Sequence, residues 1–173
     1  HMNIILASTS PYRRRLLERL QLPFHCVSPQ TDETPLPDEA PAALAVRLAR
    51  AKAKSIARLQ PGALIIGSDQ VASIEGSIMG KPGNFNSASA QLRSSSGREV
   101  VFYTAIALIT PNRDQERFHV ERFCVRFRAL SDSQIANYLH REQPYDCAGS
   151  FKVEGLGIAL FESLIGDDPT SLE

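Results

Sequence analysis

Hydroxyl and guanidinium side chains gather near the start of the chain. Residues 8–10 read Ser-Thr-Ser after a short apolar run at 4–6, and Pro11 then opens a segment with three consecutive arginines. Proline suits the first turn of a helix, so this order predicts a strand that ends and a helix that begins. The amino end of a helix attracts phosphate because its N–H groups are unpaired and its dipole is positive there, and Arg13 or Arg14 could add paired hydrogen bonds. The corner fits an anion site, although an ordinary helix cap beside solvated arginines has the same pattern.

A carboxylate follows an apolar strand in the middle of the chain. The strand predicted at 63–71 carries Asp69 and Gln70 near the point where its burial should end. A carboxylate in such a place is costly unless cations, water or a metal compensate it. A turn-capping aspartate is the alternative, but an acidic loop with Glu33 and a long helix with Lys52 supply the acids and bases of an anion site. Hard oxygen ligands without histidine or thiolate favour Mg²⁺ or Mn²⁺ over zinc.

Two later segments place charged groups beside glycines. Lys81 stands between a glycine and a proline in MGKPGN, residues 79–84, so we expect a loop to display it. Further on, SFKVEGLG, residues 150–157, combines Lys152 and Glu154 with flexible glycines that would let the backbone approach a flat ligand. For either segment alone, a solvated lysine or an ordinary glycine turn is the alternative interpretation.

Strand and helix patterns alternate along the chain that must position these groups. Strands are predicted at 4–6, 24–27, 63–71, 99–109 and 116–128, and helices from Pro11, at 42–59, at 86–95 and from 131 to about 140. An acidic, proline-rich loop precedes the long helix, and a turn at 110–114 joins the last two strands. Ser131 and Gln134 predict a capping box at the start of the last helix. This alternation is typical of an α/β chain.

The long helix at 42–59 is amphipathic. Its packed face is predicted to consist of Leu44, Leu48, Ala51 and Ser55. Lys52 is placed among the charged residues elsewhere on the helix.

Length and composition indicate one globular domain. The chain has 173 residues, of which 43% are hydrophobic, which suits a single domain, with two lobes around one cleft as a variant. Nineteen basic and nineteen acidic residues cancel, so nothing suggests wholesale binding to nucleic acid or to an anionic membrane. No membrane span or secretory signal is recognised, and three cysteines without ligand spacing indicate reduced thiols. We therefore expect a cytoplasmic protein.

Six separate segments together resemble the Maf family of nucleotide pyrophosphatases. In chain order they are ASTSPYRRRLL at 7–17, the DE pair at 32–33, Lys52, GSDQV at 67–71, GKP at 80–82 and AGSFKVEGLG at 148–157. The resemblance implies a mixed α/β fold similar to that of inosine triphosphatases, with an elongated sheet, flanking helices and a cleft between two lobes, formed by residues 1–173 as a single Maf-like domain. It also implies metal-dependent hydrolysis of nucleoside triphosphates to the monophosphate and pyrophosphate. GSDQV and SFKVEG resemble the branch that acts on 7-methyl-GTP, as opposed to the branch for dTTP and UTP.

The resemblance assigns roles residue by residue. It places the general base at Asp69 and a divalent cation, Mg²⁺ or Mn²⁺, at Glu33 and Asp69. The phosphates and the metal would be surrounded by Ser8, Arg13, Glu33, Lys52 and Lys81. Base selection would fall to Tyr12, Gln70 and Glu154, and Lys152 would complete the substrate-binding set. Whether Asp69 acts mainly as base or as metal ligand stays open.

Tyr12 and Glu154 suit the chemistry of a methylated guanine. A carboxylate can accept hydrogen bonds from guanine N1–H and the exocyclic amino group, and methylation at N7 makes the ring cationic, which strengthens stacking on Tyr12. Tryptophan is usual here in the branch that the chain resembles, and tyrosine offers a weaker π face. Two alternatives stay open: a house-cleaning pyrophosphatase for other modified or pyrimidine triphosphates, and a nucleotide-binding regulator of cell division without turnover.

The resemblance also bears on the chain end and on assembly. Family members continue past the DPTSL segment, residues 168–172, into a final apolar helix, so we expect this chain to lack that helix and to expose a groove. The expected consequence is either lower stability or an association that covers the groove. A nucleoside triphosphate is the expected partner and a homodimer the expected assembly. Neither nucleic acid nor a membrane is an expected partner.

Overall fold

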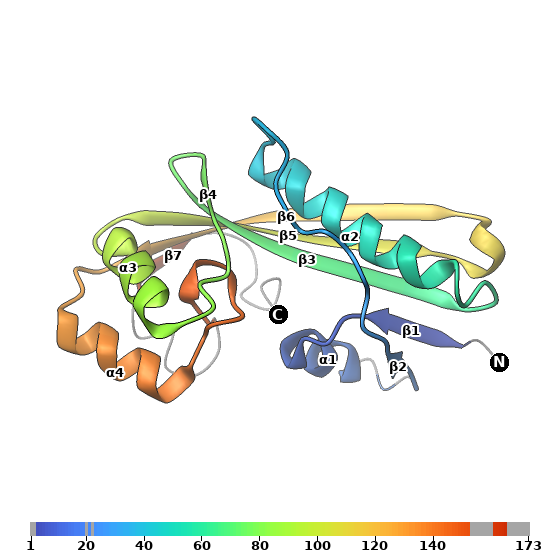
Figure 1. The fold of residues 1–173 in the computed structure, drawn as a ribbon, viewed down its shortest axis with the longest axis horizontal. Helices are drawn as coiled ribbons and strands as arrows, with labels where there is room; N and C mark the ends of the chain where they lie inside the picture. Colours follow the sequence, from blue (N-terminus) through green and yellow to red (C-terminus); the bar gives the residue numbers. More distant parts are fainter. Residues whose placement is uncertain (1–2, 20, 22, 153–160, 166–173) are drawn as a thin grey trace. The chain divides into compact units, whose positions relative to one another are not determined.

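The strands pair into one mixed sheet (Figure 1). The computed structural model describes residues 3–19, 21, 23–152 and 161–165. The strand order is β2 (His25–Cys26), β1 (Ile4–Ala7), β3 (Leu64–Ile74), β5 (Glu99–Ile109), β6 (Glu116–Phe127) and β7 (Phe161–Ile165), and β4 (Ser77–Met79) pairs with β3 off this path. Strand β1 runs parallel to β2 and β3, whereas the β3–β4 and β6–β7 pairs are antiparallel. Parallel and antiparallel pairs in one sheet with flanking helices confirm the predicted mixed α/β fold.

The chain divides into two compact units. Unit 1 holds the residues up to Gln70 together with Thr104–Glu121, and unit 2 holds Val71–Tyr103 together with Arg122–Leu172. A single domain over residues 1–173 stays a prediction. Within the described part of the chain, no helix combines the length and the hydropathy that crossing a membrane requires.

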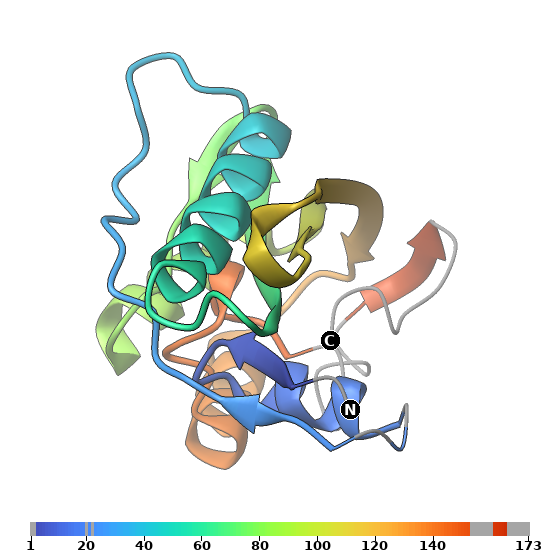
Figure 2. The same cartoon turned by 90° about the vertical axis from the view of Figure 1, so that its right-hand side faces the viewer.

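Unit 1 is organised around the contact of helix α2 (Pro41–Ala57) with strand β3 (Figure 2). Pro41 stands in the first helical turn, where its missing N–H costs nothing. A Cβ atom at Gly67 would lie 2.9 Å from the Ala53 backbone nitrogen and closer still to the Ala49 carbonyl oxygen. Only glycine therefore lets the helix backbone approach the strand this closely. Helix α1 (Pro11–Glu18) follows β1 directly.

The buried face of α2 differs from the prediction. Its buried residues are Leu44, Ala45, Leu48, Ala49, Lys52, Ala53, Ile56 and Ala57. The placement of Lys52 on the charged side of the helix was wrong, and Ala51 and Ser55 are only half-buried. Lys52 is four residues after Leu48 and four before Ile56, so helical geometry puts it on the apolar stripe whatever its charge.

Unit 2 packs helices α3 (Phe85–Ser95) and α4 (Asp132–Glu142) against each other beside an aromatic core. Phe102 and Phe127 both contact the Phe151 ring, with ring centroids 5.9 and 5.2 Å apart respectively. Phe151 follows directly after the short 3₁₀ helix η2 (Ala148–Ser150). The aromatic core therefore holds the start of the segment that carries Lys152.

Helix caps and turns follow the local sequence. Asn84 caps α3 by accepting from the Ser87 amide at 2.9 Å. At the start of α4 both hydrogen bonds of the Ser131–Gln134 capping box are present, which confirms that prediction. The turn predicted at 110–114 contains the 3₁₀ helix η1 (Pro111–Arg113).

Strand β3 is longer than the sequence predicts, and two short strands escaped prediction. The strand expected at 63–71 extends to Ile74 because residues 72–74 pair with β4, with Ala72 opposite Met79. Strand β4 is three residues long and β7 is five, and each depends on a partner distant in sequence or a tight turn for its existence. The strand at 99–109 has the predicted bounds.

Candidate functional site

A buried lysine joins two carboxylates in unit 1. The Lys52 Nζ atom donates to Asp69 Oδ1 at 2.7 Å and lies 3.2 Å from Glu33 Oε1. The Lys52 and Asp69 side chains are only 7% and 4% exposed, whereas Glu33 is 44% exposed. Burial of two charged groups costs desolvation free energy, which the attraction between them and their hydrogen bonds must offset. The cluster has one accessible end, at Glu33, where a ligand can approach.

Strand β3 and helix α2 bring Asp69 and Lys52 together. Side chains alternate along a strand, so Asp69 projects to the same face as Gly67, two residues earlier, and that face carries α2. Lys52 precedes Ala53, the α2 residue that contacts Gly67. Ser68 points the other way and donates to the Ala105 carbonyl at 2.9 Å. The close contact at Gly67 thus sets the separation at which the carboxylate meets the ammonium group.

Hydrogen bonds fix the backbone on either side of Glu33. Asp32 Oδ1 accepts from the Thr34 amide at 2.9 Å, and hydrogen bonds from the Thr34 side chain and backbone hold the pKa of Asp32 below its ordinary value. Arg47 of α2 donates to the Thr34 carbonyl at 3.0 Å and to both oxygens of Glu39, at 2.7 and 3.0 Å. Glu39 Oε1 also accepts from the Leu36 amide at 3.1 Å. The acidic loop is therefore tied to the helix that carries Lys52.

The Arg47–Glu39 pair shifts the pKa values of both side chains. The hydrogen bonds from Arg47 lower the pKa of Glu39, and the same pair raises the pKa of Arg47. Sequence reasoning missed Arg47, because an arginine on the polar side of an amphipathic helix looks solvated. The only local signal was Glu39, eight residues earlier and beyond the helix start.

The N-terminal corner has the predicted strand–turn–helix form. Ser8 is buried at 4% exposure, and its hydroxyl accepts from the Ser10 amide at 3.0 Å. Ser10 in turn accepts weakly from the Arg13 amide at 3.4 Å, at the first turn of α1. Ala7 lies opposite Gly67 in the parallel β1–β3 pair, so Ser8 follows β1 at the level where β3 approaches Asp69. The corner and the Lys52–Asp69 pair therefore belong to one region of unit 1.

The two candidate arginines of α1 differ in their surroundings. Arg14 pairs with Glu18 at 3.2 Å on the surface, where the two side chains are 62% and 53% exposed. Arg13 is half-buried and lies one residue nearer the corner. Between the two, Arg13 is the better placed to serve an anion at the corner.

Lys81 and Lys152 lie in unit 2. Lys81 is exposed in the turn after β4, which confirms the prediction that a loop displays it. The Gly83 amide donates to the Tyr145 carbonyl at 2.9 Å and so anchors this turn. Lys152 is half-buried, and its amide donates to the Tyr138 hydroxyl at 2.8 Å. Sequence reasoning missed Tyr138, which is an ordinary buried position of α4 by its spacing.

The predicted base-selecting residues are less well defined. Gln70 is half-buried, and strand alternation projects it to the opposite face of β3 from Asp69, so the structure does not bring these two side chains together. Tyr12 belongs to α1, but its side chain lies outside the described residues, as does all of Glu154. The roles of these three residues stay predictions.

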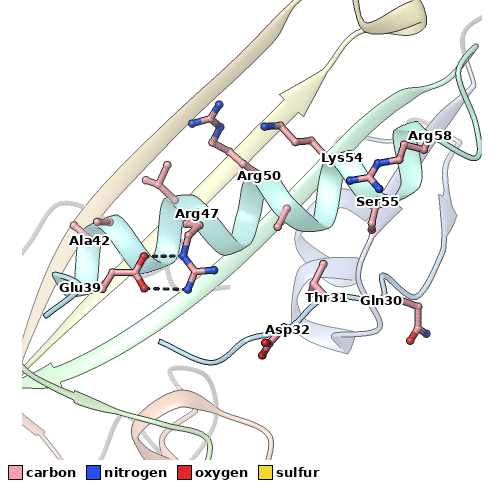
Figure 3. A pocket seen from close by; sticks show the side chains of 13 residues that line it. Gln30, Thr31, Asp32, Glu39, Ala42, Arg47, Arg50, Lys54, Ser55 and Arg58 are labelled. Carbon is pink, nitrogen blue, oxygen red and sulfur yellow. Dashed lines mark hydrogen bonds and ion pairs between the residues drawn. The ribbon is translucent and has the colours of Figure 1, made fainter. Parts of the chain in front are cut away.

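A groove of about 780 Å³ lies along the other side of α2 (Figure 3). Its lining includes Gln30, Thr31 and Asp32 of the loop together with Arg47, Arg50 and Arg58 of the helix. Its cations are largely compensated within the fold, since Arg47 pairs with Glu39 and Arg50 with Glu116 at 2.6 Å. Lys52 and the carboxylates that it binds are not among the lining residues. The groove is therefore separate from the candidate site.

Glu33 and Asp69 are the two carboxylates that could hold a metal in unit 1. Each places one oxygen within 3.2 Å of Lys52 Nζ, and an ionised carboxylate has two oxygens that can accept hydrogen bonds or bind a cation. Among the described residues, no group of three or more histidine, cysteine, aspartate or glutamate side chains could enclose an ion. This donor set suits Mg²⁺, which protein sites bind through one or two carboxylates together with water and substrate phosphates.

Comparison with known proteins assigns the chain to a family. Residues 3–172 match the family described as Maf-like protein. A relative from Colwellia psychrerythraea is 54% identical over 98% of this chain and 84% of its own. Relatives from Polaromonas sp. and Nitrosospira multiformis are both 56% identical to this chain over 98% of its length. The aligned region spans 77% of the first relative and 85% of the second. All three relatives are named 7-methyl-GTP pyrophosphatase. Since the family match spans nearly the whole sequence and includes every segment of the site, the chain belongs to the Maf-like protein family.

Proposed function

We propose that this protein is a nucleoside triphosphate pyrophosphatase that hydrolyses 7-methyl-GTP to 7-methyl-GMP and pyrophosphate. The observation that carries the proposal is the identity of 54–56% over 98% of the chain to relatives that bear the name 7-methyl-GTP pyrophosphatase. The buried Lys52–Asp69 pair with Glu33 beside it supports the same conclusion from the geometry. A protein that only bound a polyanion would need cations, and two carboxylates at its centre would weaken the binding.

In the proposed reaction, water attacks the α-phosphorus and pyrophosphate leaves. Asp69 accepts the proton of the attacking water, and Lys52 orients the carboxylate through the 2.7 Å hydrogen bond. Arg13 and Ser8 bind phosphate oxygens at the start of α1, where the helix dipole favours anions. By the family resemblance, Lys81 would add positive charge to the pyrophosphate as it leaves. These cations stabilise the negative charge that develops on the β- and γ-phosphates as pyrophosphate leaves.

Glu33 and Asp69 would hold the divalent cation that the family implies. When bound, a cation such as Mg²⁺ or Mn²⁺ polarises the α-phosphate and compensates negative charge on the leaving group. Glu33 is the more accessible of the two carboxylates, which suits a ligand shared with substrate and water.

A substrate panel with labelled water tests the proposal. Pyrophosphate and orthophosphate are measured with 7-methyl-GTP, GTP, ITP, dTTP and UTP in the presence of Mg²⁺ or Mn²⁺. We expect pyrophosphate as product, 7-methyl-GTP as the preferred substrate, and ¹⁸O from the water in the nucleoside monophosphate. Label in pyrophosphate would show attack at the β-phosphorus, a preference for UTP or ITP would indicate another substrate range, and tight binding without turnover would indicate a regulator.

A further inference from the structure

Gln91 of α3 makes two side-chain hydrogen bonds to segments that carry proposed substrate lysines. Its Nε2 atom donates to the Gly80 carbonyl at 2.8 Å, and its Oε1 atom accepts from the Ser150 hydroxyl at 2.5 Å. Gly80 immediately precedes Lys81, and Ser150 stands two residues before Lys152. One amide group therefore joins the backbone of one lysine loop to the segment of the other, and all of these residues belong to unit 2.

The chemistry of the two bonds requires an amide. The Gly80 carbonyl can only accept a hydrogen bond, so it must face the NH₂ end of Gln91, which leaves the carbonyl end for the hydroxyl. A glutamate would keep the bond from Ser150 but would set a carboxylate oxygen against the Gly80 carbonyl. A leucine of similar size would lose both bonds. The geometry thus distinguishes glutamine from residues that merely fill the same space.

The segment that Gln91 binds is fixed on its other sides as well. Ser150 is fully buried, with 0% exposure, and its φ of +60° is a left-handed conformation that a side chain rarely adopts without support. A Cβ at Gly149 would lie 3.1 Å from the Ala72 Cβ, so this turn is seated closely on β3. Beyond it, the Lys152 amide donates to the Tyr138 hydroxyl. The Gly149 amide also donates weakly to the Gly80 carbonyl, at 3.5 Å. Gln91 adds to this backbone contact a side-chain link between the segment and the Lys81 loop, made by two shorter hydrogen bonds.

We propose that Gln91 is a positioning residue for the triphosphate: it holds the Lys81 loop against the segment that ends at Lys152, so that both lysines are set before the nucleotide binds. The inference rests on the proposed function, since it takes these lysines to bind substrate. A preset loop spares the nucleotide the cost of ordering it. Loss of this side-chain link would loosen the Lys81 loop against the segment, and misplacement of a binding group by about 1 Å can cost up to ~10²-fold in rate.

The test compares Gln91→Leu and Gln91→Glu with Ser94→Ala. Ser94 is exposed on the same helix one turn away and lines the same shallow groove as Gln91, so its variant is a matched control. Circular dichroism and thermal melting establish that each variant folds, and kcat, KM and the inhibition constant of inorganic pyrophosphate are then measured. For Gln91→Leu and Gln91→Glu we expect kcat/KM to fall about 10-fold or more, with a raised KM and weaker inhibition by pyrophosphate. Ser94→Ala should match the unsubstituted protein.

A mutant cycle with Lys81→Ala separates positioning from general support of the fold. If Gln91 acts through Lys81, Gln91→Leu costs much less in the Lys81→Ala background than alone. An equal loss in both backgrounds, or unchanged KM and pyrophosphate inhibition, overturns the inference. If Gln91→Leu does not fold, Ser150→Ala, which removes one partner hydroxyl, is put through the same cycle.

Failure of the proposed function has a different signature. In that case the unsubstituted protein releases no pyrophosphate from any triphosphate of the panel. Calorimetric titration then measures the affinity of each variant for inorganic pyrophosphate, which needs no turnover. Weaker pyrophosphate binding by Gln91→Leu than by Ser94→Ala supports the positioning role of Gln91. Equal affinity of the two variants overturns it.

Discussion

Gly67 and Asp69 project from the same face of β3, and the first sets the separation at which the second meets Lys52. Because the glycine has no side chain, α2 lies directly on the strand, and Lys52 reaches the Asp69 carboxylate at 2.7 Å from the apolar side of the helix. A small residue that carries no chemistry itself thus determines the geometry of the charged pair.

Gly67→Ala should damage both stability and activity. The added Cβ would lie 2.9 Å from the Ala53 nitrogen and nearer to the Ala49 carbonyl, so α2 must move away from β3. Overpacking of this kind costs about 1–3 kcal/mol of unfolding free energy, which urea denaturation measures. The matched control is Gly62→Ala, where a Cβ meets nothing within 4 Å and the variant should be as stable as the parent. Equal stability of the two variants would contradict the close contact.

Asp69→Asn should lower pyrophosphate release by at least ~10²-fold, the scale of lost acid–base or metal-assisted catalysis. The fold should persist, because Lys52 still has Glu33 at 3.2 Å and the asparagine carbonyl can accept its hydrogen bond. Asp38→Asn is the control, since Asp38 is an exposed aspartate and its φ of +57° suits asparagine. Near-normal turnover of Asp69→Asn with added Mg²⁺ or Mn²⁺ would sink the catalytic assignment.

Lys52→Met should destabilise the protein more than Asp69→Asn does. The variant leaves the Asp69 carboxylate, 4% exposed, without its cation, and breaking a buried pair in this way costs about 3–5 kcal/mol. The double variant Lys52→Met, Asp69→Leu should recover much of that loss without recovering activity. Urea denaturation and pyrophosphate release, measured on the same preparations, check both statements. A single variant as stable as the parent would show that the pair contributes little.

Most of the fold was predictable because local patterns and tertiary contacts agree. The strand at 99–109 and the capping box at Ser131 and Gln134 needed nothing beyond the adjacent sequence. Strands β4 and β7 were missed because a run of three or five residues becomes a strand only when a partner is present.

The sequence predicted the residue types of the site better than it predicted which of these residues contact one another. The position of Asp69 at the end of an apolar run indicated a paired carboxylate, and the structure supplies Lys52 as the partner. The burial of Lys52 was missed because the residue was assigned to the exposed face on the basis of its charge. Its spacing of four residues from Leu48 and from Ile56 would have placed it on the buried face. Gln91 could not have been found, since its hydrogen bonds join residues 11 and 59 positions away and leave no local pattern.

The Glu39–Arg47 pair should make stability depend on pH in the acid range. Hydrogen bonds from Arg47 lower the pKa of Glu39 in the folded state, so the folded protein binds the proton less readily than the unfolded chain. The pair therefore stabilises the fold above the ordinary glutamate pKa of about 4.3, and the contribution is lost as pH falls through the lower, folded value.

Two variants check the sign of this dependence. Arg47→Gln should be less stable than the parent near neutral pH, and the difference in unfolding free energy should shrink as pH falls below about 4. Arg58→Gln, an exposed arginine of the next turn after α2, should differ little from the parent at any pH. A difference for Arg47→Gln that grows on acidification would reverse the assignment.

The family resemblance assigns the choice of base to Tyr12, Gln70 and Glu154. If Glu154 accepts from guanine N1–H and the amino group, Glu154→Gln should cost about 1–3 kcal/mol of discrimination, more than it costs in affinity for the triphosphate. If Tyr12 stacks on the cationic methylated ring, Tyr12→Trp should shift preference toward 7-methyl-GTP over GTP, because indole has the stronger π face. The measured quantities are the ratios of kcat/KM for 7-methyl-GTP to those for GTP and UTP, with the exposed Glu99→Gln as control. Ratios that stay constant through both substitutions would place base recognition elsewhere and remove the chain from the 7-methyl-GTP branch.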